Sequence, residues 1–302
     1  MLVSVFIPFV NEEKNLPEVI ERVEKGGKSA GVDIELIMVD DGSDDNSYSS
    51  AKIASANKEW VKIFRHQRNL GLTEAMKTGF KKCKGEIIIF LPSDLQSHPD
   101  EDIPALLNGF EKGVDVVCGR RKKRKEVKIF LSRIYNDISN FLFGLKLHDM
   151  NWIKAFRRDC LDDLDLRSDW HRFIVQILHE KGYKVKEVPV KWHPRKSGKS
   201  HFGFKRIPIS FLDSIAVKFV LTFTRAPMRI FGSMGIFQLF ISFTITGWLL
   251  YATFVLGEPS FRTRPLMYFI VALFLSGLIF LFMGFLAELI VGLRDEIKKM
   301  KE

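Results

Sequence analysis

Short apolar runs alternate with helix-length segments over the first two-thirds of the chain. Strands are expected at the apolar runs 3–7, 34–39, 61–64, 86–91, 114–118 and 184–192. Between them, apolar residues recur at the spacing of one helix face, most clearly over 127–143. Asn15 is placed to cap the helix that follows the first run. This alternation predicts an α/β fold with a doubly wound, mainly parallel sheet.

The pattern changes beyond Gly203, where apolar residues dominate. The stretches 232–256 and 266–293 are free of charge apart from Glu288, and each exceeds the roughly 20 residues that cross a bilayer as a helix. Buried core helices are the alternative, but helices of that kind usually carry a polar face. We therefore expect three parts: an α/β domain at 1–202, an interfacial amphipathic segment at 203–229, and two transmembrane helices with a short tail at 230–302.

Charge indicates how such a pair of helices would be oriented. The flank before the first span and the tail after the second are basic, whereas the connector carries only Arg262 and Arg264. The positive-inside rule then places the α/β domain and both termini on the cytoplasmic side of the cell membrane. The three cysteines are isolated from one another, which fits a reducing compartment.

The overall charge points to an anionic partner. The chain has 46 Lys and Arg against 36 Asp and Glu, a net charge of +10. Nucleic acid, a phospholipid surface and phosphorylated small molecules all fit that sign. The basic run 120–128 lacks interleaved aromatic residues, so nucleic acid is the weakest of the three.

Polar loops follow the first four expected strands. They read PFVNEE, DDGSDD, RNLG and PSDLQ, and the carboxyl ends of parallel strands are where open α/β sheets bind ligands. Neither the dinucleotide-binding glycine fingerprint nor a Walker sequence is present. A crevice rich in carboxylates that also binds phosphate implies a bridging Mg²⁺ or Mn²⁺.

Six segments in chain order resemble the motifs of one family. VFIPFVNEEKNL, VDDGSDDNS, RNLGLTEAMKTGF, FLPSDLQSHP, GRR…FLSRIYN and HDMNWIKAFRRD are similar to those of family-2 glycosyltransferases of GT-A-type fold. They most resemble the polyprenyl-phosphate glycosyltransferases, the group that contains dolichyl-phosphate mannose synthase and bacterial undecaprenyl-phosphate glucosyltransferases. The resemblance implies inverting transfer of one sugar from a nucleotide-diphosphate sugar to a dolichyl or undecaprenyl phosphate at the cytoplasmic face of the membrane. It also allows a homo-oligomer.

The resemblance assigns the donor side of the site to the polar loops. The implied nucleotide-sugar contacts are Pro8, Asn11, Glu12, Asp40, Asp41, Asn69, Gly71, Ser93 and Asp94. Asp94 and Gln96 would hold Mg²⁺ or Mn²⁺. The family usually has a further aspartate where this chain has Pro92. This leaves three alternatives: Asp94 and Gln96 complete the metal site together with diphosphate and water, the affinity for the metal is reduced, or the reaction needs no metal. The first is favoured, because Mg²⁺ commonly uses one or two carboxylates.

The acceptor side follows from charge. A hydroxyl acceptor needs a general base, whereas a phosphate monoester needs cations to position it. The resemblance selects Arg120, Ser132, Arg133, Asn136, Arg195 and Lys199 for this task, and it makes Asp94, Asp149 and Arg133 the catalytic candidates. Asp149 would be a base for a hydroxyl acceptor, or would position sugar or acceptor when the acceptor is a phosphate.

Two alternative functions stay open. The protein could transfer the sugar to a hydroxyl of a glycolipid or polysaccharide, or it could be a catalytically silent scaffold subunit.

Overall fold

The computed structural model describes two compact units, Met1–Ile215 and Ala216–Glu302, each considered by itself. The described residues are 1–122, 140, 142–150, 152–162, 164, 166–167, 169–194, 206–223, 226–257 and 265–300. The division between the units falls within one helix, α8 (Arg206–Phe223).

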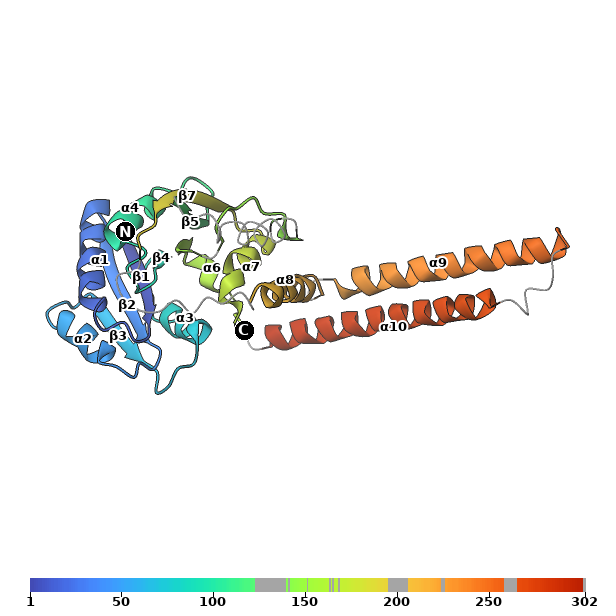
Figure 1. Cartoon of the computed structure of the whole chain (residues 1–302), viewed down its shortest axis with the longest axis horizontal. Helices are drawn as coiled ribbons and strands as arrows, with labels where there is room; N and C mark the ends of the chain where they lie inside the picture. The colour runs from blue at the N-terminus through green and yellow to red at the C-terminus, as the bar shows by residue number, and fades with distance from the viewer. Residues whose placement is uncertain are drawn as a thin grey trace. The chain divides into compact units, whose positions relative to one another are not determined.

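The described part of the first unit contains a seven-stranded mixed sheet in the order β3-β2-β1-β4-β6-β5-β7. Strands β1, β2 and β3 lie next to one another in it (Figure 1). Its strands are β1 Leu2–Phe9, β2 Asp33–Asp40, β3 Val61–Arg65, β4 Ile87–Phe90, β5 Val116–Lys122, β6 Lys154–Arg157 and β7 Val185–Lys191. Strands β1 to β4 pair in parallel, as do β5 and β7. Among the strands that the structure describes, only β6 runs antiparallel, against β4 and β5. The predicted α/β fold is confirmed, and β6 is the strand that the sequence did not predict.

The helices of this unit follow the strands in the expected alternation. They are α1 Leu16–Ala30, α2 Ser47–Ala54, α3 Leu72–Phe80, α4 Pro99–Leu107, α6 Asp159–Asp162, the 3₁₀ helix η1 Trp170–Phe173 and α7 Ile174–Glu180. Asn15 lies at the N-cap position of α1, but its side chain donates to the Glu12 carboxylate instead of capping the helix. The helix expected over 127–143 lies almost entirely outside the described residues.

A continuous apolar core holds the sheet to its helices. Alternate residues of the central strands, such as Val5 of β1 and Met38 of β2, are fully buried. They pack with the buried face of α1, which presents Leu16, Val19 and Ile20. Burying each large aliphatic side chain contributes about 1.5–3 kcal/mol. The core therefore fixes the directions of the strands, and with them the positions of the loops at their carboxyl ends.

The second unit contains two long apolar helices, α9 Pro227–Phe254 and α10 Leu266–Lys299. Pro227–Phe254 and Leu266–Ile297 are long and apolar enough to cross a membrane, by length and composition alone, and their residues are mostly exposed. The two helices approach closely at a glycine pair, because a Cβ on Gly235 would lie 2.7 Å from the Gly277 carbonyl oxygen. Glu288 of α10 accepts a hydrogen bond from the backbone N–H of Met228, 3.3 Å away, so this charge lies beside the start of α9.

Candidate active site

The four polar loops leave the sheet at one edge. Strands β1 to β4 are parallel, and the register pairs Phe9 with Asp40 and Asp40 with Arg65, the last residues of neighbouring strands. The loops that begin at residues 10, 41, 66 and 91 therefore start side by side. This is the edge at which open α/β sheets bind ligands.

Asp40 ends β2 as a fully buried carboxylate whose two oxygens face different partners. Its Oδ1 accepts hydrogen bonds from the backbone N–H and the hydroxyl of Ser43, at 2.9 and 2.6 Å. Its Oδ2 lies 3.1 Å from the Nε of Arg65, yet it accepts no hydrogen bond from the described residues. A cavity of about 500 Å³ is lined by Arg65, His66, Gln67, Arg68 and Leu70. The ion pair with Arg65 balances the buried charge of Asp40, and Arg65 in turn lines the cavity.

Asp41 organises the third loop. Its carboxylate accepts the backbone N–H groups of Leu70 and Gly71 and pairs with the His66 ring at 2.8 Å. Asn69 adds a second acceptor for the Gly71 N–H, at 3.0 Å. Both Asp41 oxygens thus hold loop backbone, and they set the shape of the segment that leads into α3.

The first loop is fastened to the second. Asn11 has a left-handed backbone with φ of 55°, its N–H donates to the Ser43 hydroxyl, and its Oδ1 accepts the Asp44 N–H. The backbone N–H of Glu12 donates to the Ser47 hydroxyl at 2.8 Å. Pro8 is partly buried near the end of β1. The predicted donor-side residues of β1 and β2 are therefore brought together.

The fourth loop presents the predicted metal ligands. Ser93 and Asp94 are each only 7% exposed, and Asp94 Oδ1 accepts the backbone N–H of Gln96 at 3.1 Å. Leu95 between them has a left-handed backbone with φ of 56°, so Asp94 and Gln96 flank a tight turn. A carboxylate and an amide offer the oxygen ligands that Mg²⁺ and Mn²⁺ prefer, and the donor set therefore fits such an ion. Pro92 adds no side-chain oxygen to it.

Asp149 forms a two-pronged ion pair that the sequence did not predict. Arg121 donates from Nε and Nη2 to its two oxygens, at 2.6 and 2.9 Å. The Arg121 guanidinium also lies over the Trp152 ring, 4.6 Å from its centroid. Glu187 of β7 accepts the backbone N–H of Asp149 at 2.9 Å. Arg120, the neighbour on β5, is exposed, because successive residues of a strand point to opposite faces.

Lys154 is a cationic residue that sequence reasoning missed. It begins β6 opposite Phe90, the last residue of β4, and only 3% of it is exposed. Its ammonium donates to the Trp152 carbonyl at 3.0 Å. Burial lowers the pKa of this ammonium, while the charge of Asp149 opposes that change. The signal that could have found it is a lysine inside a short apolar stretch, IKAF.

Five of the predicted acceptor residues cannot be placed. They are Ser132, Arg133, Asn136, Arg195 and Lys199, and all lie outside the described residues. Their assigned roles stay predictions.

A comparison with protein families decides what kind of site this is. The model of the family described as glycosyl transferase family 2 matches residues 4–165, which include every one of the four loops. The chain belongs to this family. It is therefore a glycosyltransferase, as the sequence predicted.

Curated relatives match almost the full length of this family member. The dodecaprenyl-phosphate galacturonate synthase of Rhizobium johnstonii is 32% identical over 296 residues, which cover 95% of this chain and 87% of that protein. The undecaprenyl-phosphate 4-deoxy-4-formamido-L-arabinose transferase of an Enterobacter species is 29% identical over 300 residues, with 98% and 90% covered. Both alignments are too long to leave out the two apolar helices.

Solved structures share the fold of most of this chain. Glucosyl-3-phosphoglycerate synthase from Mycobacterium tuberculosis in complex with Mn²⁺, UDP and phosphoglyceric acid superimposes with a TM-score of 0.55 at 18% identity, covering 72% of this chain and 78% of that one. A structure of that enzyme with Mg²⁺ and UDP gives 0.54 at 19% identity, with the same coverage. At this identity the likeness concerns the fold alone.

Proposed function

We propose that this glycosyltransferase moves one sugar, with inversion at the anomeric carbon, from a nucleotide-diphosphate sugar to a polyprenyl phosphate at the cytoplasmic face of the membrane. The observation that carries the proposal is the pair of near full-length relatives, both named for transfer involving a polyprenyl phosphate. The two membrane-length helices on the same chain support it, because a polyprenyl chain resides in the bilayer.

The donor would bind over the carboxyl edge of β1 to β4. Asp40 would contribute to base recognition through its ion pair with Arg65, which lines the cavity together with His66, Gln67, Arg68 and Leu70. The loop that contains Asn11 and Glu12 is already tied to the second loop, so little ordering is required when the nucleotide binds.

Asp94 and Gln96 would hold Mg²⁺ or Mn²⁺ against the diphosphate. When bound, the ion supplies positive charge that stabilises the departing nucleoside diphosphate. The protein's own contribution is to keep the two ligands in position through the 3.1 Å hydrogen bond from the Gln96 N–H to Asp94.

The acceptor phosphate would supply its own nucleophile. One of its oxygens forms the new bond to the anomeric carbon while the bond from that carbon to the diphosphate oxygen breaks, so no proton has to be removed. Both oxygens of Asp149 are engaged by Arg121, which makes this carboxylate unsuited to act as a base. That arrangement favours a phosphate acceptor over a hydroxyl. Arg120 is exposed on the neighbouring position of β5 and would contribute positive charge.

An acceptor comparison tests the proposal. The purified chain in detergent is given labelled nucleotide sugars with Mn²⁺, and either an undecaprenyl or dolichyl phosphate or the matching alcohol. We expect labelled lipid only with the phosphate. Product from the alcohol alone would establish hydroxyl transfer instead, and no product with any donor would favour a scaffold role.

A further inference from the structure

Lys154 places a buried cation at the carboxyl edge of the sheet. It begins β6 and pairs in register with Phe90, the last residue of β4, and only 3% of it is exposed. Because β6 runs antiparallel to β4, the residues before Lys154 lie beyond the end of β4. The ammonium donates to the carbonyl of one of them, Trp152, at 3.0 Å. It therefore faces the loops beyond the edge of the sheet.

The Lys154 ammonium has no anionic partner among the described residues. The Trp152 carbonyl is its hydrogen-bond acceptor, and no carboxylate in the described part of the chain forms an ion pair with it. Asp149 is near enough to act on its charge, but the Arg121 fork occupies both Asp149 oxygens, at 2.6 and 2.9 Å. A buried charge without a partner is costly, so an anion bound beside Lys154 would stabilise its charged form.

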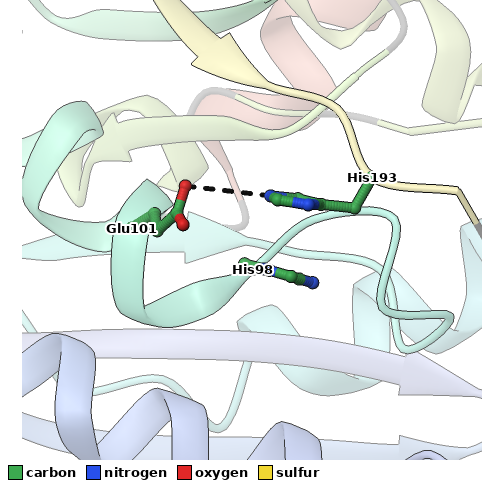
Figure 2. Close-up of side chains that lie close together, drawn as sticks. All are labelled: His98, Glu101 and His193. Atoms are coloured by element: carbon green, nitrogen blue, oxygen red, sulfur yellow. Dashed lines mark ion pairs between the residues drawn. The ribbon is translucent and has the colours of Figure 1, made fainter.

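The loop after β4 does not need Lys154 for support, because the segment after β7 holds it. His98 precedes α4 and His193 follows β7. Figure 2 shows their rings stacked, with the Glu101 carboxylate beside His193. The backbone N–H of His193 also donates to the Gln96 carbonyl at 3.1 Å. Fixing this loop is therefore not what the buried charge of Lys154 is for.

The order of the strands indicates which part of the substrate Lys154 would face. Strand β6 lies between β4, which leads to the proposed metal ligands, and β5, which carries Arg120 on the proposed acceptor side. The transferred sugar has to lie between the donor diphosphate and the acceptor phosphate, because one bond breaks and the other forms at its anomeric carbon. An edge residue of β6 is therefore placed opposite the sugar. This step rests on the proposed function.

We propose that Lys154 binds a carboxylate on the transferred sugar, so that the donor is a nucleotide-diphosphate uronic acid. A carboxylate carries one negative charge, which a single ammonium balances, whereas the acceptor phosphate carries about −1.5 to −2 and needs several cations. A sugar that has only hydroxyl groups would leave the buried charge of Lys154 without an anion. The carboxylate supplies both the charge and acceptor oxygens.

Binding of paired donors, with no acceptor present, tests the inference. The full chain in detergent with Mn²⁺ is titrated calorimetrically with UDP-glucuronate and UDP-glucose, UDP-galacturonate and UDP-galactose, and GDP-mannuronate and GDP-mannose. We expect the acidic member of at least one pair to bind at least about 10-fold more tightly than its neutral partner, as a hydrogen bond between charged groups allows. Lys154→Met should remove this preference. Free UDP or GDP should bind the variant as it binds the unaltered chain, which shows that the variant is folded.

Lys112→Met is the matched control, because Lys112 is exposed in the turn before β5, at the opposite edge of the sheet. It should keep the preference for the acidic donor. The inference is overturned if the unaltered chain binds no acidic donor more tightly than its neutral partner, or if Lys154→Met keeps the preference.

Two other outcomes separate this inference from the proposed function. Equal weakening of acidic donors, neutral donors and free nucleoside diphosphate in Lys154→Met would place the lysine at the diphosphate, and this also overturns the inference while leaving the proposed function intact. A chain that binds none of these nucleotides contradicts the proposed donor as well as the inference.

Discussion

The carboxylates of the candidate site differ in how the protein already uses their oxygens. Asp41 holds backbone N–H groups of the third loop with both oxygens, and Asp149 faces the Arg121 fork. Asp40 keeps one buried oxygen without a hydrogen bond from the described residues. The first two therefore shape the loops, and Asp40 holds Arg65 beside the cavity that Arg65 lines.

Asp94 should be the most sensitive single position for catalysis. Asp94→Asn keeps the size of the side chain but removes its charge, so position 94 would hold the metal ion, and through it the diphosphate of the donor, less strongly. We expect kcat/KM to fall by at least about 100-fold, about 2.7 kcal/mol in activation free energy. Steady-state transfer to a polyprenyl phosphate over a range of Mn²⁺ concentrations measures both the rate and the metal requirement.

Asp33→Asn is the matched control, because Asp33 is an exposed aspartate at the opposite end of β2. Asp33→Asn should leave kcat/KM and the Mn²⁺ requirement unchanged. Equal activity of the Asp94 and Asp33 variants at every Mn²⁺ concentration would show that Asp94 is not a metal ligand.

The sequence is sufficient to predict a site residue when that residue lies in a loop directly after a recognisable strand. Asp40 and Asp94 could be selected because each follows an apolar run that becomes a parallel strand. The Arg121–Asp149 pair and Lys154 could not, because their positions depend on β6, a strand of four residues that pairs with β4 and β5 from far along the chain. A run as short as KAFR has too few positions to reveal strand periodicity.

At the scale of elements, the second and third loops touch through a glycine. Gly42 has φ of 74°, and a Cβ there would lie 2.3 Å from the carbonyl carbon of Arg68. No side chain fits at this point unless the loops separate. The Asp40–Ser43 turn and the loop held by Asp41 are therefore one rigid assembly.

Gly42→Ala should destabilise this assembly strongly. The methyl group meets backbone that cannot rotate away, and the left-handed conformation adds strain, for a total of about 3 kcal/mol. For a unit of this size that corresponds to a fall in Tm of about 6–12 °C, measured by thermal unfolding in detergent. Nucleotide binding should weaken as well, because the loops move apart.

Gly31→Ala is the control that separates backbone strain from steric overlap of the added methyl group. Gly31 has φ of 66° at the end of α1, and no atom lies within 4 Å of the position that an added methyl group would take. The substitution should cost about 1 kcal/mol, or about 2–4 °C, with nucleotide binding unchanged. Equal losses in the two variants would mean that the loops are not locked at Gly42.

At the scale of the whole molecule, one chain combines a glycosyltransferase sheet with two helices of membrane length. The sequence predicted these helices well, since hydropathy over some 20 residues needs no knowledge of tertiary contacts. It did not predict that α9 starts as early as Pro227, or that Gly235 and Gly277 bring the helix pair together. Those features depend on how the helices pack.

The proposed orientation predicts which side of the membrane the C-terminus faces. Cys83, Cys118 and Cys160 are all buried, so a cysteine introduced on the surface can be labelled selectively. Met300→Cys, at an exposed position, should resist a membrane-impermeant maleimide in intact cells and react after permeabilisation. Ser260→Cys, in the connector between the spans, should react in intact cells. The reverse pattern would invert the proposed topology.

The order of the strands along the chain also bears on how the protein is made. The four strands that lead into the polar loops lie within the first 90 residues and are synthesised first. Strand β6, at residues 154–157, is synthesised later, and the two apolar helices follow it. Because domains tend to fold from the N-terminus as the ribosome releases them, the half of the sheet that carries the four polar loops can form early, whereas the opposite half waits for β6. Under the proposed function, the two apolar helices would therefore engage the membrane only after all seven strands have been synthesised.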